Sequence, residues 1–462
     1  MSKDLSKVKF FNSILDTIGN TPLIRLNKLN KGLKPHIFVK VESFNPGGSI
    51  KDRIGCEIIE DAERTGRIKP GGTIVESTSG NTGMGLAIAA AVKGYKTVFT
   101  MPDKMSAEKI SNLRAFGAEV IVTPTAVPHE SPESYTEVAK QRVRETPNSI
   151  LADQYENPKN PEAHYKTTGP EIWDQTGGQI DYFICGLGTG GTITGTAKYL
   201  KEKNPNIKVI GVDIKGSILQ EYFYKRKYDP VFKTYKVEGI GQDYIPKTLD
   251  FNFVDEVVMA DDRESFLAAR RLTREEGIFT GGSSGTALHA GLEYCKTIPE
   301  DKIVVILLPD SGSRYVSKMY NDVWMRENGF LRPERITLRY ILDSKQSELQ
   351  ELISVNRSTT IRQAIELIKR HNISQLPVID SGRSIGIVTE SNLLSCVVDD
   401  VANFEKSVAT AMENPLPEIH MNEEVQTAVK YFMQKLPAVI ITDHEKPIGI
   451  ITRFDVLEYM SH

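Results

Sequence analysis

Gly47-Gly-Ser-Ile-Lys-Asp-Arg53 follows an apolar, strand-like run at 37–41 and precedes an amphipathic segment at 54–65 that predicts a helix. This order of strand, glycine loop and helix places Lys51 in the first turn of the helix. Exposed N–H groups and the positive end of the helix dipole both disfavour an ammonium group there. A lysine whose pKa is lowered in this way can form a Schiff base or act as a base. The heptapeptide alone leaves open an ordinary surface lysine beside a Ser49 cap.

The chain of 462 residues is long enough for two or three domains, at roughly 150 residues each. It is 40% hydrophobic and 25% charged, which is ordinary for a globular protein, and its net charge is −3. Because no basic stripe with interleaved aromatic residues is present, we expect no nucleic-acid partner. The N-terminus lacks an apolar signal segment, and the apolar run 303–308 is too short to span a bilayer. We therefore expect a cytoplasmic protein without a membrane partner.

The cysteine and histidine residues give no metal-binding pattern. The four cysteines are widely separated and include no Cys-x-x-Cys pair, which argues against a zinc knuckle or a dithiol redox motif. We expect buried free thiols and no metal site. The cysteines are Cys56, Cys185, Cys295 and Cys396. His164 lies in a predicted helix, where we expect packing or a surface hydrogen bond.

Residues 10 to about 320 alternate short β-branched segments with helical patterns. The predicted strands are 73–76, 96–101, 119–123, 182–185, 208–213 and 303–308. The predicted helices are 54–65, 84–93, 107–116, 135–144, 192–202, 263–276 and 286–296. This alternation predicts an α/β fold whose parallel sheets are covered by helices and bind ligands at the carboxyl ends of the strands. Glycine-rich loops in suitable positions are 43–50, 77–83 and 186–192, and 281–285 also leads into a helix.

The composition changes after Trp324. We predict a catalytic domain at 1–324, an irregular linker at 325–345 and a second domain at 346–462. The second domain contains two similar halves, at about 346–400 and 404–462. Each half predicts a helix, two strands and a helix, and the repeated strand reads Ile385-Gly-Ile-Val-Thr389 and Ile448-Gly-Ile-Ile-Thr452. Because one half is too small to bury a good core alone, we expect the two to pack as a pair.

Three glycine loops suggest chemistry. Gly188-Thr-Gly-Gly-Thr192 suits a phosphate, because converging N–H groups and a helix dipole attract an anion. A dinucleotide loop, with Asp213 as its acidic residue, and a purely structural turn stay open. Ser77–Gly83 suits a carboxylate but equally a capped helix start, and Gly281–Gly285 alone predicts capping. A reactive lysine, a phosphate cradle and a carboxylate cradle together are what pyridoxal phosphate with an amino-acid substrate needs.

Four motifs in this order resemble the fold-type II pyridoxal-phosphate β-replacement family, and in particular its cystathionine β-synthase branch. They are Ser49–Arg53, Thr78–Thr82, Gly188–Thr192 and Gly281–Gly285. Gly239–Pro246 is similar to the substrate loop of that branch, and the C-terminal halves resemble the two CBS motifs of a Bateman module. The resemblance covers nearly the whole chain. It implies a fold-type II domain of parallel twisted sheets covered by helices, followed by an α+β Bateman module.

The resemblance also implies a role for each matching position. Lys51 would hold pyridoxal 5′-phosphate and then act as the catalytic base and acid. The cofactor phosphate would be bound by Gly188, Thr189, Gly190, Gly191 and Thr192, its 3′ oxygen by Asn81 and its pyridine nitrogen by Ser283. The substrate carboxylate would be held by Thr78, Ser79, Thr82 and Gln154. The rest of the substrate site would be formed by Tyr155, Gly239, Gln242 and Tyr244.

The chemistry that these roles imply is β-replacement. A serine hydroxyl at the pyridine nitrogen cannot protonate it as a carboxylate could, which favours elimination of a β-substituent over transamination. The resemblance therefore implies condensation of L-serine with L-homocysteine to L-cystathionine and water, with hydrogen sulfide released when cysteine replaces serine. The alternative is a cysteine synthase that uses O-acetylserine and sulfide. A retired enzyme serving as an adenosyl sensor is a third hypothesis, and the intact Lys51 argues against it.

Two departures from the family pattern affect these expectations. Gln242 and Tyr244 stand where animal and fungal relatives usually have tyrosine and phenylalanine, so homocysteine and sulfide both stay open as the thiol acceptor. Animal members also carry a haem-binding N-terminal extension with a Cys-Pro pair. This chain enters the catalytic pattern at Asp16–Pro22, and we expect no haem.

The C-terminal repeats differ in their ligand motif. Thr452-Arg-Phe-Asp455 resembles the Thr-x-x-Asp that grips a ribose in nucleotide-binding CBS motifs, whereas the first repeat has Asn392 in the acidic place. We expect at most one adenosyl site, for S-adenosylmethionine or an adenine nucleotide. Ile373-Ser374 replaces a Phe-Asp pair of the S-adenosylmethionine-regulated animal enzyme. A repeat pair that only dimerises or packs on the core stays open, and the resemblance implies a homodimer or a higher homo-oligomer.

Overall fold

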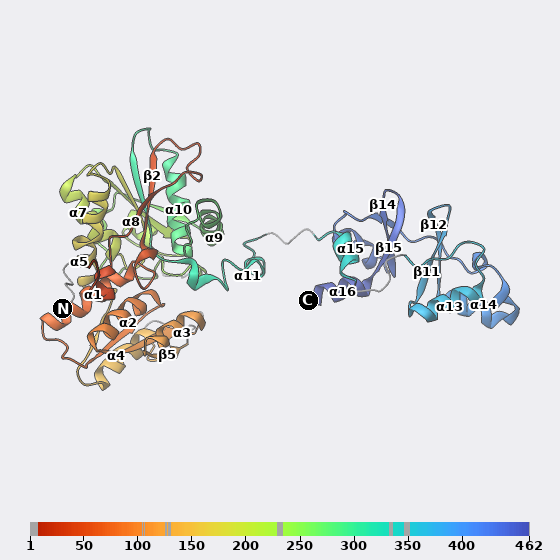
Figure 1. The fold of residues 1–462 in the computed structure, drawn as a ribbon, viewed down its shortest axis with the longest axis horizontal. Helices are drawn as coiled ribbons and strands as arrows, with labels where there is room; N and C mark the ends of the chain where they lie inside the picture. The colour runs from red at the N-terminus through yellow and green to blue at the C-terminus, as the bar shows by residue number, and fades with distance from the viewer. Residues whose placement is uncertain are drawn as a thin grey trace. The chain divides into compact units, whose positions relative to one another are not determined.

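The computed structural model describes residues 8–103, 105, 107–124, 127, 131–228, 234–331, 336–345 and 352–461. The chain divides into two compact units, an N-terminal unit at 1–331 and a C-terminal unit at 332–462 (Figure 1). Within the described residues, no helix combines the length and the hydropathy that a membrane crossing requires.

The N-terminal unit is built on two sheets, both largely parallel, as predicted. The larger has the strand order β1-β2-β10-β7-β8-β9, and only β1 pairs antiparallel. Its strands are β1 (Leu23–Arg25), β2 (His36–Val41), β7 (Tyr182–Gly186), β8 (Lys208–Ile214), β9 (Glu256–Ala260) and β10 (Ile303–Leu308). The smaller has the order β5-β4-β3-β6 and is parallel throughout. Its strands are β3 (Thr73–Ser77), β4 (Lys96–Pro102), β5 (Glu119–Thr123) and β6 (Ser149–Leu151).

Helices pack around both sheets (Figure 1). They are α1 (Lys51–Arg64), α2 (Asn81–Lys93), α3 (Ala107–Ala115), α4 (Tyr135–Glu145), α5 (Lys159–Lys166), α6 (Thr168–Gln175), α7 (Gly191–Lys203), α8 (Leu219–Lys225), α9 (Asp262–Arg271), α10 (Gly282–Cys295) and α11 (Asp322–Glu327). Short 3₁₀ helices are η2 (Ile14–Thr17), η3 (Glu42–Phe44), η4 (Phe251–Phe253) and η6 (Gly312–Tyr315). The predicted helix at 263–276 is α9 followed by the π-helical turn η5 (Leu272–Glu276).

The sequence patterns missed some elements and some helix starts. Strands β1, β6 and β9 lie at sheet edges, where partial exposure leaves no continuous apolar run. Helix α10 begins at Gly282 rather than Thr286, because its first turn consists of glycine and serine, which have low helix propensity. The glycines are needed for packing: a Cβ atom at Gly285 would collide with the backbone oxygen of Ser265 on α9.

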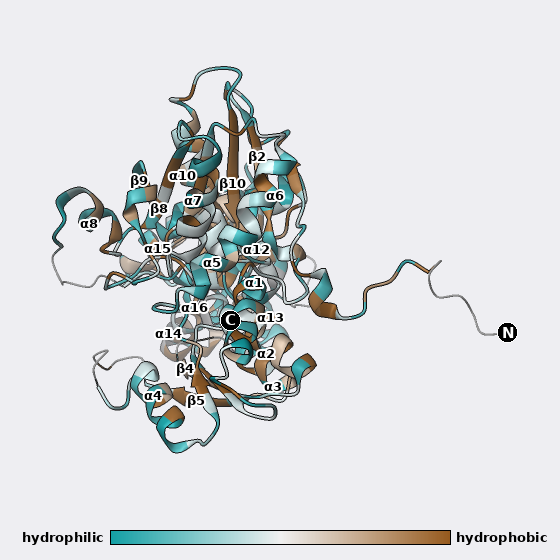
Figure 2. Cartoon of the chain, turned by 90° about the vertical axis from the view of Figure 1, so that its left-hand side faces the viewer, coloured by the Kyte–Doolittle hydropathy of each residue, from teal (hydrophilic) through white to brown (hydrophobic). Residues whose placement is uncertain are grey.

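Two apolar cores meet where α1 begins. Ile54 packs with Phe99 in the core of the smaller sheet, whereas Ile50 packs with Phe183 in the core of the larger sheet. Strand β10, in the middle of the larger sheet, is hydrophobic and almost wholly buried (Figure 2). Lys51 therefore lies at the junction of the two sheets.

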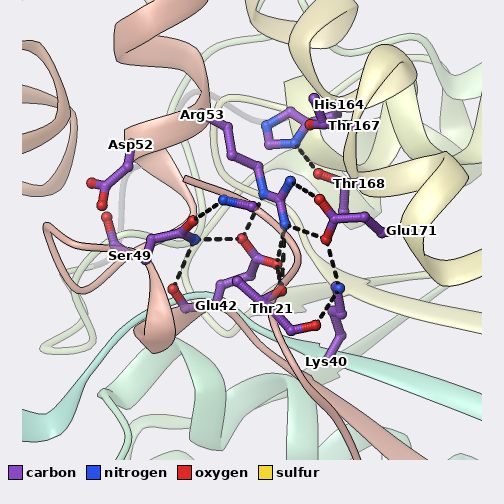
Figure 3. A network of polar contacts seen from close by, with 12 residues as sticks. Thr21, Lys40, Glu42, Ser49, Asp52, Arg53, His164, Thr167, Thr168 and Glu171 are labelled. Carbon is purple, nitrogen blue, oxygen red and sulfur yellow. Dashed lines mark hydrogen bonds and ion pairs between the residues drawn. The ribbon is translucent and has the colours of Figure 1, made fainter. Parts of the chain in front are cut away.

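A buried ionic network fixes the start of α1 (Figure 3). The Arg53 guanidinium lies 2.8 Å from Glu42 Oε2 and 2.7 Å from Glu171 Oε1, and the side chains of Arg53 and Glu42 are 1% and 0% exposed. Lys40 Nζ lies 2.7 Å from Glu171 Oε2 and donates to the Thr21 carbonyl at 2.7 Å. Burial raises the pKa of Glu171, but Arg53 and Lys40 outweigh burial and lower this pKa to about 2. The Glu171 carboxyl is therefore ionised at neutral pH and forms true ion pairs with Arg53 and Lys40.

Residues of the motif at 16–22 contact the carboxylates of this ionic network. The Thr21 hydroxyl donates to Glu42 at 2.6 Å, and a Cβ atom at Gly19 would lie 2.8 Å from Glu171 Oε1. Asp52 closes the neighbouring loop, because its Oδ2 accepts from the Gly47 N–H at 2.5 Å. The residues flanking Lys51 are thus structural.

The C-terminal unit shows the predicted order of helix, two strands and helix in each repeat. The first repeat has α13 (Ile361–His371), β11 (Gln375–Asp380), β12 (Arg383–Thr389), α14 (Glu390–Asp399), η7 (Val401–Glu405) and η8 (Val408–Thr410). The second has β13 (Glu418–His420), α15 (Val425–Met433), β14 (Ala438–Asp443), β15 (Lys446–Thr452) and α16 (Arg453–Ser461). Ile387 of the first repeat is buried against Ala438 and Ile440 of the second, so the two pack as a pair.

The expectation of an irregular linker over 325–345 is wrong at both ends. Met325 lies in α11 and is buried in the N-terminal unit, and α12 (Leu338–Ser344) packs Leu338 and Ile341 into the core of the C-terminal unit. The charged neighbours Arg339 and Asp343 are exposed and masked this apolar spacing. Residues 332–335 and 346–351, which include the predicted boundary at 346, lie outside the described residues.

All four cysteines are free. Cys185 and Cys295 are buried, but Cys56 and Cys396 are partly exposed, so the expectation of four buried thiols is wrong for these two. They lie in α1 and α14, each of which leaves part of its surface uncovered.

Candidate functional site

Lys51 is the first residue of α1 and keeps partial surface exposure. Burial lowers the pKa of its amine, and nearby acidic groups, among them Asp310 and Glu42, offset this only in part. Burial thus lowers the pKa in the same direction as the sequence argument from the helix N-terminus. In the described part of the chain, the amine makes no hydrogen bond and no ion pair. An accessible amine with a lowered pKa is a nucleophile and a base.

The glycine loop before α7 is shaped by close packing. Gly190 has φ +85°, and a Cβ atom there would collide with Leu249. A Cβ atom at Gly191 would collide with the Asn160 amide, which donates to Thr189 Oγ1 at 3.0 Å. The N–H groups of the first turn of α7 have no partner within the helix, so the loop suits an anion.

The structure argues against the dinucleotide alternative for this loop. Asp213 is fully buried, and its two oxygens accept from the N–H groups of Ile214 and Gln220, each at 2.9 Å. The carboxylate that would bind a ribose is thus committed to the backbone.

His164 is a site residue that the sequence analysis missed. It is fully buried, with Nε2 3.2 Å from Thr192 Oγ1 and Nδ1 2.9 Å from Thr168 Oγ1, so it makes no surface hydrogen bond. Burial, together with the charges of Lys51 and Arg53, holds the pKa of His164 well below its usual range. A neutral imidazole carries one donor and one acceptor and therefore fixes the Thr192 hydroxyl. The position of His164 within the predicted helix did not indicate this contact with Thr192.

Asn81, the first residue of α2, is held by two residues that follow β10. Its Nδ2 donates to Asp310 Oδ2 at 2.9 Å, and its Oδ1 accepts from the Arg314 guanidinium. Asp310 and Arg314 also escaped the sequence analysis, because no glycine motif marks their segment. Backbone bridges pair Asp310 with Ser49 and Ser311 with Thr280. They bring this segment to the loop from Gly47 to Lys51, which we call the lysine loop.

Ser283 lies where three loops meet. It is buried in the first turn of α10, whose N-cap Gly281 makes no side-chain cap, so the capping interpretation of 281–285 is wrong. A Cβ atom at Gly239 would lie 3.9 Å from Ser283 Oγ, and one at Gly188 would lie 2.9 Å from the Gly239 oxygen. Small residues therefore line the space between the phosphate loop and Ser283.

In the loop before α2, Thr78 and Thr82 make hydrogen bonds within the protein, whereas Ser79 is partly accessible. Thr78 Oγ1 accepts from the N–H groups of Gly80 and Gly83 at 3.0 and 3.2 Å, so it stabilises the turn, as the capping alternative expected. The Thr82 hydroxyl donates to Gln154 Oε1 at 2.5 Å, which links this loop to the end of β6. Ser79 is partly exposed.

Tyr155 and the 239–246 loop lie side by side. The ring centroids of Tyr155 and Tyr244 are 5.8 Å apart, and Gln242 contacts Tyr155 closely enough to oppose the rise that burial causes in the pKa of its hydroxyl. Glu76 holds the Tyr155 loop, because its carboxyl accepts from the Asp153 N–H at 2.7 Å. Burial raises the pKa of Glu76 to about 8.

Thr452 and Asp455 belong to the C-terminal unit. Asp455 Oδ2 accepts from Thr452 N at 2.5 Å and Oγ1 at 2.8 Å, and Lys345 Nζ lies 2.7 Å from the same oxygen. In the first repeat, Asn392 Oδ1 accepts from Thr389 N at 2.7 Å but no described cation pairs with it. Lys345 was not anticipated, because it lies in the segment predicted as linker.

The donors of the N-terminal unit fit pyridoxal phosphate. The unpaired Lys51 amine suits its carbonyl carbon, the Gly188–Thr192 loop its phosphate, Asn81 its 3′ oxygen and Ser283 its pyridine nitrogen. Gly188 and Gly239 bring the phosphate loop near Ser283, because a Cβ atom at Gly188 would lie 2.9 Å from the Gly239 oxygen and one at Gly239 would lie 3.9 Å from Ser283 Oγ.

Comparisons with known proteins agree with this fit. The family model "Pyridoxal-phosphate dependent enzyme" matches residues 14–310, and "CBS domain" matches 348–399 and 406–462. The cystathionine β-synthase of Dictyostelium discoideum is 42% identical over 98% of this chain and 93% of its own, and that of Saccharomyces cerevisiae is 39% identical over all of both. A hydrogen sulfide-producing enzyme from Fusobacterium nucleatum, of known structure, is 39% identical over 66% of this chain and all of its own, with a TM-score of 0.62. The chain therefore belongs to the pyridoxal-phosphate-dependent enzyme family, among the cystathionine β-synthases, and joins this catalytic fold to a pair of CBS domains.

Proposed function

We propose that the chain is a cystathionine β-synthase that condenses L-serine with L-homocysteine to L-cystathionine and water. The observation that carries this proposal is the unpaired Lys51 amine at the junction of the two sheets, with a phosphate-binding loop and a hydroxyl-rich loop beside it. The relatives of that name match nearly the whole chain, CBS repeats included. The enzyme is a pyridoxal-phosphate-dependent lyase.

One group of residues would bind the cofactor, and Lys51 would transfer the proton. Bound pyridoxal phosphate supplies an electron-withdrawing ring that stabilises negative charge at the substrate α-carbon. The Gly188–Thr192 loop would hold its phosphate, Asn81 would bind its 3′ oxygen and Ser283 would face its pyridine nitrogen. Lys51 removes the proton from the serine α-carbon and returns it after the thiol has replaced the β-hydroxyl, because its lowered pKa leaves the amine free to accept a proton.

The substrates contact two loops. Ser79, with Thr78, Thr82 and Gln154 behind it, binds the serine carboxylate at the N-terminus of α2, where the helix dipole favours an anion. The loop from Gly239 to Tyr244 forms the thiol site beside Tyr155. Sulfide as the thiol acceptor is the second candidate, because Gln242 departs from the usual tyrosine. The structural relative that produces hydrogen sulfide also favours release of sulfide when cysteine replaces serine.

Product analysis by mass spectrometry tests the function. The purified chain, loaded with pyridoxal phosphate, receives serine with homocysteine or O-acetylserine with sulfide in parallel. We expect cystathionine from the first mixture to form at least about tenfold faster than cysteine from the second. Dominant cysteine with little cystathionine would instead identify a cysteine synthase with a regulatory module.

We further infer that the second CBS repeat binds an adenosyl ligand through Thr452 and Asp455. The Lys345 ammonium group pairs with the Asp455 carboxylate and adds a positive charge to this site. A positive charge there favours a phosphate-bearing adenine nucleotide over the cationic S-adenosylmethionine. By titration calorimetry we expect ATP to bind more tightly than S-adenosylmethionine, and Asp455→Ala to abolish binding. Asn392→Ala, the matched change in the first repeat, should leave binding intact. Equal binding to wild type and Asp455→Ala would contradict this site.

A homodimer, which the resemblance to the family implies, and a cytoplasmic location complete the proposal. Light scattering on the purified chain tests the oligomeric state, and a monomer at micromolar concentration would contradict it.

A further inference from the structure

Asp310 and Arg314 hold the Asn81 side-chain amide from both sides. We propose that these two residues are positioning residues that aim one N–H of Asn81 at the 3′ oxygen of the cofactor. This inference rests on the proposed function, because it assumes that Asn81 contacts pyridoxal phosphate.

The chemistry of the two partners fixes the orientation of the amide. A guanidinium can only donate hydrogen bonds, so the Asn81 atom that faces Arg314 must be the oxygen. An ionised carboxylate can only accept, so the atom that faces Asp310, at 2.9 Å, must be the nitrogen. The Asn81 nitrogen carries two hydrogens, and Asp310 takes one of them. The other remains available to a ligand oxygen in a direction that the two partners determine.

Asp310 is itself held firmly. It is 1% exposed, and its Oδ2 also accepts from the Tyr315 hydroxyl at 2.6 Å. The backbone on either side is bonded to both neighbouring loops: the Ile50 N–H donates to the Pro309 oxygen at 2.8 Å, and the Gly281 N–H donates to the Asp310 oxygen at 3.2 Å. The carboxylate is thus fixed relative to the loops that carry Lys51 and Ser283.

Arg314 ties the same amide to the lysine loop. Its guanidinium donates to Asn81 Oδ1 and to the backbone oxygen of Gly47, and the residue is 7% exposed. Because Gly47 opens the loop that ends at Lys51, a single side chain sets the position of Asn81 relative to the loop that carries the reactive amine. Without Arg314 and Asp310 the amide could rotate by 180° and present its oxygen to the cofactor oxygen, which repels it.

A double-mutant cycle on cofactor affinity tests this coupling. Apoprotein of the wild type, Asp310→Ala, Asn81→Ala and the double variant is titrated with pyridoxal phosphate and followed by protein fluorescence. Loss of a hydrogen bond to a charged group predicts about 10- to 100-fold weaker binding for each single variant. If Asp310 acts through Asn81, the double variant should bind within about threefold of Asn81→Ala. Losses that multiply, or an unchanged affinity of Asp310→Ala, would overturn the inference.

Three further measurements separate positioning from general stability. Tyr294→Phe removes a tyrosine–carboxylate hydrogen bond outside this network, from Tyr294 to Glu256 at 2.8 Å, and should keep the affinity within about threefold. The visible absorbance band of the bound cofactor should shift in the same direction in Asp310→Ala and in Asn81→Ala, whereas a merely structural defect would leave it in place. If Asp310→Ala does not fold, Arg314→Met replaces it in the same cycle with the same expectation. If the wild type binds pyridoxal phosphate but Asp310 and Asn81 show no coupling, only the positioning inference fails. If the wild type binds no pyridoxal phosphate, the proposed function fails as well.

Discussion

Lys51→Ala is expected to lower turnover by about 10⁴-fold or more, because the variant lacks both the group that holds the cofactor and the base at the substrate α-carbon. The same variant should stay folded. Alanine is a good residue for the first turn of α1, and the Lys51 amine has no partner in the described structure that its loss would leave unpaired. The measurement is the initial rate of cystathionine formation together with a thermal unfolding curve, and the absorbance of lysine-bound cofactor should disappear.

Lys40, a fully buried lysine, provides the matched control. Lys40 is fully buried but pairs with Glu171 and the Thr21 carbonyl, so Lys40→Ala should lower the unfolding temperature while the folded fraction keeps its turnover. Lys51→Arg should be as inactive as Lys51→Ala, because a guanidinium does not give up its proton at neutral pH. Turnover of Lys51→Ala within a hundredfold of wild type would contradict the mechanism.

The glycine loops and Lys51 were predictable because they combine a local chain pattern with a specific chemical need. A strand, a glycine loop and a helix follow one another in the sequence, and the loop lies at the carboxyl end of the strand in any parallel sheet. The Gly188–Thr192 loop was located in this way. Ser283 was not: Gly281–Gly285 alone predicts capping, and a role for Ser283 came only from the family resemblance. In the structure both lie close to Gly239.

Asp310, Arg314 and His164 could not be predicted in the same way. Each acts through a side chain that reaches a residue distant in the sequence, and nothing in its own neighbourhood differs from an ordinary helix or loop. Asp310 becomes part of the site only because β10 ends between the lysine loop and α10. Helix α12 was missed for a related reason: its apolar residues are few, and the core that buries them comes from a repeat about a hundred residues later.

The largest expected loss of stability comes from Arg53→Met, which leaves the Glu42 and Glu171 carboxylates buried with only Lys40 to balance them. Removing one partner from a buried ion pair costs about 3–5 kcal/mol of unfolding free energy. For a unit of this size that corresponds to a fall of roughly 4–7 °C in the unfolding temperature, measurable by calorimetry. Arg271→Met is the matched control, because Arg271 pairs with Glu275 at 2.8 Å but its side chain is 61% exposed. We expect that control to shift the unfolding temperature by less than about 1 °C.

The pH dependence of this loss identifies its cause. Arg53 is a main reason why the pKa of Glu171 falls from its usual 4.5 to about 2 in the folded chain. A carboxyl with a lowered folded pKa stabilises the fold fully above its unfolded pKa, and this contribution is lost as the pH falls toward the folded value. The difference in unfolding free energy between wild type and Arg53→Met should therefore be largest near neutral pH and shrink between pH 4.5 and pH 2. A cavity left by the shorter side chain would instead cost the same at every pH, so a difference that does not change with pH would show that packing, not charge pairing, is what Arg53 contributes.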